Sequence, residues 1–225
     1  MLIKFGSIVT DGRGKLGGQV YSKNRAGSYV RNNAIPSNPR TTFQMKSRNL
    51  LAQLSQAWSG LTEQERNAWN GAVEKFPRKN VFGDTRNLTG KNLFTSLNKN
   101  LLQVGKSQLE VPPAPADSIG ISDYSAISNI AEDELEINVT TENSNGDLVI
   151  RATPPVSPGK TYVKNLLRVI DYGSATGNAQ TVNVLNTYTD RFGSLSENQV
   201  IYFGIYSVNS AGVKSPEVIF RHIIQ

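Results

Sequence analysis

Apolar residues recur every three or four positions in three stretches of the first half of the chain, and this spacing predicts three amphipathic helices. We expect the first helix to begin at Ser37 or Asn38, because the following Pro39 suits a first helical turn, and to end at Gly60. The apolar positions of this helix are Phe43, Leu50, Leu51, Leu54 and Trp58.

The next two helices have clear start signals. Thr62 followed by Glu65 predicts a capping box, so we expect the second helix to begin there and to stop at Pro77. The third begins near Thr89 and ends at Gly105. The apolar residues of these two helices are Trp69, Val73, Phe76, Leu93, Phe94, Leu97, Leu101 and Leu102. Three such helices can share a small core, in which we place Trp58, Trp69 and Phe94.

A glycine-rich stretch of alternating residues precedes the helices. It predicts short strands over residues 5–10, 18–22 and 27–31, separated by turns in which glycine accepts a positive φ. Few of its side chains are large enough to build a core, and isolated hairpins are marginally stable in water. We therefore expect this ribbon to become ordered against another surface, either the helices or a neighbouring subunit.

Closely spaced prolines at 109–117 predict an extended linker. After it, short apolar stretches separated by turn residues predict an all-β sandwich. The strand candidates include 135–141, 148–153, 163–171, 181–188, 200–208 and 218–224. The expected fold is therefore α+β and multidomain, with a basic β-ribbon or arm at 1–36, a helical domain at 37–107, a linker at 108–118 and a β-sandwich at 119–225.

Residues 199–216 read Gln-Val-Ile-Tyr-Phe-Gly-Ile-Tyr-Ser-Val-Asn-Ser-Ala-Gly-Val-Lys-Ser-Pro. This segment resembles the last two strands of a fibronectin type III domain, where a Tyr begins the penultimate strand and an Asn-x-x-Gly turn leads to the last one. The resemblance implies an Ig-like sandwich with Tyr202 in its core.

Charge divides the chain near residue 108. Residues 1–108 carry 17 Lys and Arg against 5 Asp and Glu, whereas the remainder carries 7 against 13. A positive half prefers an acidic protein surface or nucleic acid. Cysteine is absent, which excludes disulfides, thiolate nucleophiles and cysteine-based metal sites. Without a run of 18 apolar residues or a secretory signal, we expect neither a membrane partner nor secretion.

The patterns that resemble catalytic or ligand sites are all incomplete. Residues 12–17 have the spacing of a dinucleotide-binding loop, but a predicted strand follows instead of the required helix. His222 is the single histidine and can form neither a catalytic triad nor an ordinary zinc site. The acidic residues at 132–136 could hold calcium, but such a run is more often a solvated turn. We therefore expect no enzyme activity, no catalytic residue, no cofactor and no metal.

The strongest binding signal lies in the ribbon, where basic and aromatic side chains are interleaved. The candidate interaction residues are Arg13, Lys15, Tyr21, Lys23, Arg25, Tyr29, Arg31 and Arg40. Such a segment could follow a phosphate backbone, or it could be an arm that pairs with a neighbouring subunit.

Two resemblances bear on the front half of the chain. Residues 51–69, with Trp58, Leu61-Thr62, an acidic turn and Trp69, are similar to the second and third helices of an HMG box. That resemblance implies nucleic-acid binding through the basic half.

A wider resemblance covers residues 11–105 and rests on residues 17–31, the turn at 36–41, the helices of Trp58 and Trp69, and residues 88–94. Together these look like proteins of tailed bacteriophages and prophages. The resemblance implies a structural protein of the virion, made in the host cytoplasm. Its partners would be other copies of itself and other virion proteins, in a ring at the head-to-tail connection or neck, or in the tail. Nucleic-acid binding, capsid decoration and adhesion through the β-sandwich stay open as alternatives.

Overall fold

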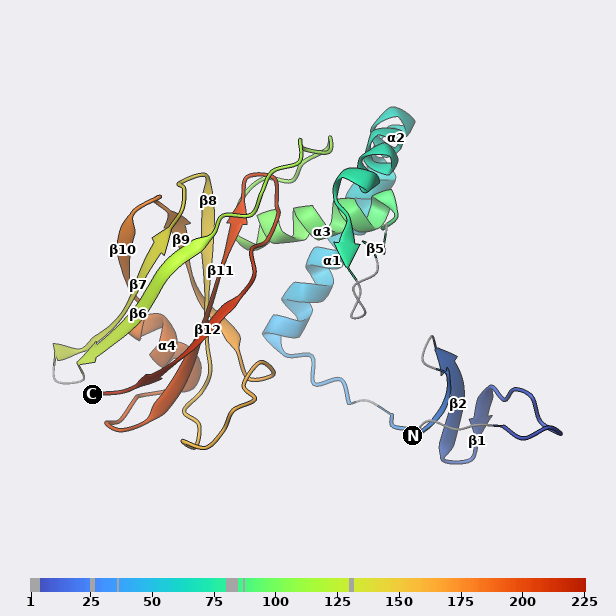
Figure 1. The fold of residues 1–225 in the computed structure, drawn as a ribbon, viewed down its shortest axis with the longest axis horizontal. Helices are drawn as coiled ribbons and strands as arrows, with labels where there is room; N and C mark the ends of the chain where they lie inside the picture. Colours follow the sequence, from blue (N-terminus) through green and yellow to red (C-terminus); the bar gives the residue numbers. More distant parts are fainter. Residues whose placement is uncertain (1–4, 25–26, 36, 80–84, 87, 130–131) are drawn as a thin grey trace. The chain divides into compact units, whose positions relative to one another are not determined.

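The computed structural model describes residues 5–24, 27–35, 37–79, 85–86, 88–129 and 132–225. The protein is an α+β protein with antiparallel sheets (Figure 1). It divides into two compact units, Met1–Lys46 and Ser47–Gln225. Each unit is described by itself.

The first unit contains a three-stranded antiparallel sheet in the order β1-β2-β3. Its strands are β1 (Gly14–Leu16), β2 (Gln19–Asn24) and β3 (Gly27–Asn32). Gly17 has a φ of +55° in the turn between β1 and β2, where glycine carries no steric cost. The strand expected over residues 5–10 is wrong: Ser7 and Ile8 lie in a turn, and no strand of the described residues pairs with this segment.

The helices are α1 (Thr42–Gly60), α2 (Glu63–Ala72) with the 3₁₀ turn η1 (Val73–Lys75), and α3 (Gly90–Gln103). The first helix begins later than expected, because Arg40 has a φ of +50° and cannot be helical. Thr41 then accepts a hydrogen bond from the amide of Gln44. The capping box of Thr62 and the cap at Thr89 are both confirmed. A short antiparallel pair, β4 (Arg78–Lys79) and β5 (Thr85–Arg86), was not expected.

The helices enclose a small aromatic core. Trp69 and Phe94 are fully buried and meet edge to face, with 5.3 Å between ring centroids. Trp58 is half buried, and the centroid of its ring lies 5.5 Å from that of Phe94. Leu54, Leu93 and Leu97 complete the contacts. The periodicity of the sequence therefore places these residues together on facing helices.

The C-terminal residues form a three-stranded sheet, β10-β7-β6, and a four-stranded sheet, β12-β11-β8-β9, both antiparallel. The strands are β6 (Ile121–Asn129), β7 (Glu134–Thr141), β8 (Gly146–Ala152), β9 (Arg168–Ala175), β10 (Ala179–Asn183), β11 (Val200–Asn209) and β12 (Val218–Ile223). Alternate residues of β7, β8 and β11 from the two sheets share one hydrophobic core.

Three sequence expectations for this part need correction. The strand expected at 163–171 begins only at Arg168. The strand expected at 181–188 ends at Asn183, and the helix α4 (Leu185–Phe192) follows, burying Tyr188 in the core. Tyr202 is partly exposed and lies outside the core, because Ile201 and Phe203 take the inward positions of β11 and the intervening residue faces the other way.

The proline-rich segment is extended, and its first residues are held by the helices. The buried side chain of Asn98 accepts a hydrogen bond from the amide of Leu109 at 2.6 Å and donates one to its carbonyl at 3.1 Å. Trp69 Nε1 donates to the carbonyl of Glu110 at 2.6 Å. The independence of 37–107 and 119–225 as domains stays a prediction.

Candidate interaction surfaces

The ribbon sheet of the first unit has no core of its own. Among the described residues of 5–46, none is buried. Several large apolar side chains are instead open to solvent, with Leu16 exposed by 73%, Ile35 by 89% and Ile8 by 97%. Burial of apolar area is the main force that stabilises a folded domain, so this sheet lacks an internal source of stability.

The strand register assigns the predicted interaction residues to two faces. Lys15 pairs with Val20, and Val20 pairs with Arg31, so these three side chains form one row on one face. Tyr29 belongs to the same face, because it lies two residues from Arg31 along β3. Tyr21 lies on the opposite face, as does Lys23. The structure therefore separates side chains that the sequence had grouped together.

The remaining predicted residues are dispersed. Arg13 forms an exposed ion pair with Asp11 at 3.4 Å, and Arg40 lies in the turn before α1. Arg25 lies outside the described residues. By contrast, Lys15, Lys23 and Arg31 have no carboxylate within ion-pair distance in the described part of the chain. These three cations are available to an external anion.

A second surface, which sequence reasoning missed, joins α3 to the four-stranded sheet. The turn after β11 packs directly on the helix, where the carbonyl of Gly212 accepts a hydrogen bond from Asn100 Nδ2 at 2.9 Å. Gly212 has a φ of +78°, and a Cβ at this position would lie 2.5 Å from the carbonyl oxygen of Leu97. Only glycine fits both the turn and the contact.

The same turn is held from inside by Asn209. Its side-chain oxygen accepts hydrogen bonds from the amides of Ala211 at 3.1 Å and Val213 at 2.8 Å, while its amide group donates to the carbonyl of Asp117 at 2.8 Å. The Asn-x-x-Gly motif therefore does two things here: it closes the turn and it presents the turn to α3. The motif was visible in the sequence, but nothing in the sequence indicated that a helix would lie against it.

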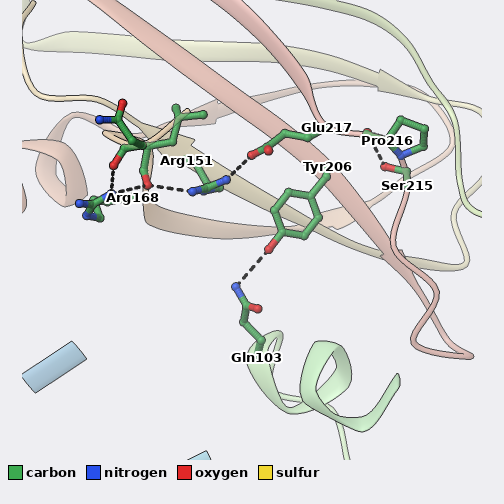
Figure 2. Close-up of polar contacts among 9 residues, drawn as sticks. Gln103, Arg151, Arg168, Tyr206, Ser215, Pro216 and Glu217 are labelled. Carbon is green, nitrogen blue, oxygen red and sulfur yellow. Dashed lines mark hydrogen bonds and ion pairs between the residues drawn. The ribbon is translucent and has the colours of Figure 1, made fainter. Parts of the chain in front are cut away.

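Figure 2 shows the polar contacts beside this turn. Gln103, in the last turn of α3, donates a hydrogen bond to the hydroxyl of Tyr206 at 3.1 Å. The ammonium group of Lys214 lies 3.5 Å from the centre of the Tyr206 ring, a cation–π contact. Arg151 forms an ion pair with Glu217 at 2.6 Å and donates to the carbonyl of Leu167 at 2.8 Å. The bond of Gln103 therefore ties the end of α3 to strand β11, while Arg151 ties β8 to the segment before β12.

Burial governs the ionisation of this cluster. It raises the pKa of Tyr206 and, as the largest effect, lowers the pKa of Lys214. Burial also raises the pKa of Tyr172 on the neighbouring strand β9. The tyrosine hydroxyls therefore stay neutral near pH 7 and can act as hydrogen-bonding groups.

A cleft of about 390 Å³ lies between α3 and the turn. Its lining has two cations, Arg78 and Lys214, and no carboxylate. Arg78 already bonds the hydroxyl of Ser96, however, and Lys214 lies on the Tyr206 ring. Both cations therefore have partners within the chain. The cleft is better explained as a gap in the packing between α3 and the turn after β11 than as a ligand site.

The structure also places the groups that sequence analysis weighed for chemistry. His222 Nε2 lies 2.9 Å from the hydroxyl of Ser128, and burial lowers its pKa. No cluster of three or more acidic or imidazole side chains suited to a metal ion occurs among the described residues. Within the same residues, no helix has the length and apolar character needed to cross a membrane.

Comparison with known proteins gives no relative: neither a scan of protein-family models nor a search of curated proteins finds a match to this chain.

Proposed function

We propose that this protein is a non-enzymatic structural subunit of a tailed-phage virion, acting through contacts between copies in a ring at the neck or in the tail. The observation that carries the proposal is the ribbon, a three-stranded sheet with exposed apolar side chains and no buried residue among those described. A sheet of this kind gains stability by covering its faces against another chain.

The second unit, which has a buried hydrophobic core, is consistent with this role. We propose that residues 119–225 are an Ig-like, fibronectin type III-like sandwich. Lettered A to G in chain order, strands β6 to β12 form the sheets A-B-E and D-C-F-G. A constant-type immunoglobulin sandwich has the sheets A-B-E-D and C-F-G, so the two arrangements differ only in the sheet that holds strand D. Such modules often serve as building blocks rather than catalysts.

The alternative is nucleic-acid binding, which the unpaired cations of the ribbon favour. Their distribution argues against it. A segment that follows a phosphate backbone gathers its cations on one side, whereas Lys15 and Lys23 lie on opposite faces of this sheet.

The test is the mass of the full-length protein in solution, measured by light scattering after size exclusion from about 1 to 100 µM, with and without duplex DNA. We expect oligomers that form without DNA and increase with concentration. Val20→Asp, which puts a carboxylate at the centre of the ribbon, should shift the protein to monomer. Val111→Asp, at an exposed site of the proline-rich segment, is the matched control.

A protein that stays monomeric throughout this range would overturn the proposal. A monomer that associates only with DNA, and dissociates as salt rises, would favour the nucleic-acid alternative.

A further inference from the structure

The three-stranded sheet β10-β7-β6 has an outer face with an unusual composition. Its three strands contain no Lys and no Arg. Their three carboxylates, Asp123, Glu134 and Glu136, all face outward, because the alternate residues of β7 enter the core and directly paired residues share a face. Three carboxylates and no cation of these strands therefore lie on one side of this sheet.

The remaining outward positions are small or polar apart from Ile127, a large apolar side chain that is exposed by 53%. They are Ser125, Ile127, Asn129, Asn138, Thr140, Ala179, Thr181 and Asn183. None of these side chains is buried. None of the three carboxylates forms an ion pair with a described residue. Nothing in the described part of the second unit therefore neutralises this face.

We propose that this acidic face binds the basic ribbon of a second copy of the chain. The inference rests on the proposed function, because it names the surface through which copies would associate. The two surfaces have complementary charge: the strands of the ribbon carry Lys15, Lys23 and Arg31 and no carboxylate. On one face of the ribbon, Lys15 and Arg31 flank the apolar side chain of Val20, with one cation on each side.

The dimensions also match. Six-residue strands such as β2 and β3 are about 20 Å long, and the eight residues of β7 span about 27 Å, so the ribbon fits within the sheet. Lys15 and Arg31 lie two strand spacings apart, about 10 Å. Their long side chains can reach Glu134 and Glu136, which lie two residues apart on the central strand. Two sheets stacked face to face complete the contact.

A contact between two different surfaces is heterologous, so it repeats around a ring or along a filament instead of closing a two-fold dimer. Each copy then binds one neighbour through its ribbon and another through its acidic face. The footprint of a single ribbon is small, which makes one contact weak, and a closed ring strengthens it because every copy is held twice.

The experiment uses two full-length double variants and their mixture. Lys15→Glu with Arg31→Glu reverses the ribbon, and Glu134→Lys with Glu136→Lys reverses the sheet face. We expect each variant alone to associate at least about tenfold more weakly than the native protein, because like charges then oppose each other. A 1:1 mixture should assemble again, since each reversed surface meets a complementary one on the other variant.

Matched controls carry the same charge changes at other exposed sites. The control for the ribbon variant is Lys91→Glu with Lys164→Glu. The control for the sheet variant is Asp190→Lys with Glu197→Lys. Circular dichroism confirms the folding of each protein. Both controls should assemble as the native protein does.

The outcomes separate this inference from the proposed function. If the native protein forms oligomers and the sheet variant forms them equally well, copies do associate but not through the acidic face, and the inference is overturned. Two weakened variants that fail to assemble on mixing also overturn it. A native protein that never associates removes the proposed function itself.

Discussion

Single residues hold this fold together where the chain makes close approaches. Three residues each allow or make a specific backbone contact that another residue at the same position would make less well. They are Gly212, Asn209 and Asn98. None of them is a candidate for chemistry. The polar groups of these two asparagines connect segments of the chain that are distant in sequence.

Gly212→Ala should destabilise the protein by about 1–3 kcal/mol, because the new Cβ both strains the positive φ and meets the carbonyl oxygen of Leu97. Gly159→Ala is the matched control, since a Cβ there meets no atom within 4 Å. Urea denaturation of the two variants measures the difference. Equal stabilities would show that the turn does not depend on its contact with α3.

The pH dependence of stability between pH 7 and pH 5 should depend on His222, the single histidine. Burial lowers its pKa, so in this range the unfolded chain binds more protons than the folded one. The free energy of unfolding should therefore fall as the pH drops from 7 to 5. His222→Gln, which can still bond Ser128, should reduce this slope, and an unchanged slope would contradict the prediction. Nuclear magnetic resonance titration of the imidazole gives the pKa directly.

At the scale of elements, local capping signals were the most reliable guide. Thr62 and Thr89 start helices where the sequence predicts, because a cap is a contact within four residues. The helix α4 was not predicted, because residues 181–184 alternate as in a strand and the expected strand extends to residue 188. The helical signal was the spacing of Leu185, Tyr188 and Phe192. The contact between α3 and the four-stranded sheet could not be predicted, because the residues that form it lie about 100 positions apart in the sequence.

Tyr206 should determine how firmly α3 is attached to the sheet. Tyr206→Phe removes the hydrogen bond from Gln103 but keeps the ring beneath Lys214, so we expect a loss of about 1 kcal/mol. Tyr206→Ala removes both contacts and a buried ring, and we expect a loss of about 3–5 kcal/mol. Hydrogen exchange should then speed up in the last turn of α3. Unchanged exchange rates there in both variants would contradict the prediction that Tyr206 attaches the end of α3 to the sheet.

At the scale of the whole molecule, the boundary between the two compact units falls near the start of α1, between Lys46 and Ser47, and not in the proline-rich segment. The latter is anchored by Asn98 and Trp69, which are both buried. The part of the chain that the sequence marks as a linker is therefore tied to the helices at its first residues.

Trypsin tests this difference. We expect early cleavage at Arg40, which is exposed in the turn before α1, and a resistant product that begins at Thr41. Lys106, just before the proline-rich segment, forms an ion pair with Asp147 and should be cut later. Mass spectrometry of the fragments over time identifies the order. Cleavage first at Lys106 would instead support the domain boundary predicted from the sequence.

The position of the ribbon at the end of a connecting segment has a consequence for geometry. Residues 33–41, which include no described helix or strand, can span at most about 30 Å when fully extended. If the ribbon binds a neighbouring copy as proposed, this tether limits how far away the bound surface can lie. Shortening or lengthening the tether would then change the angle between neighbouring copies, and with it the curvature of the assembly, without altering either contact surface.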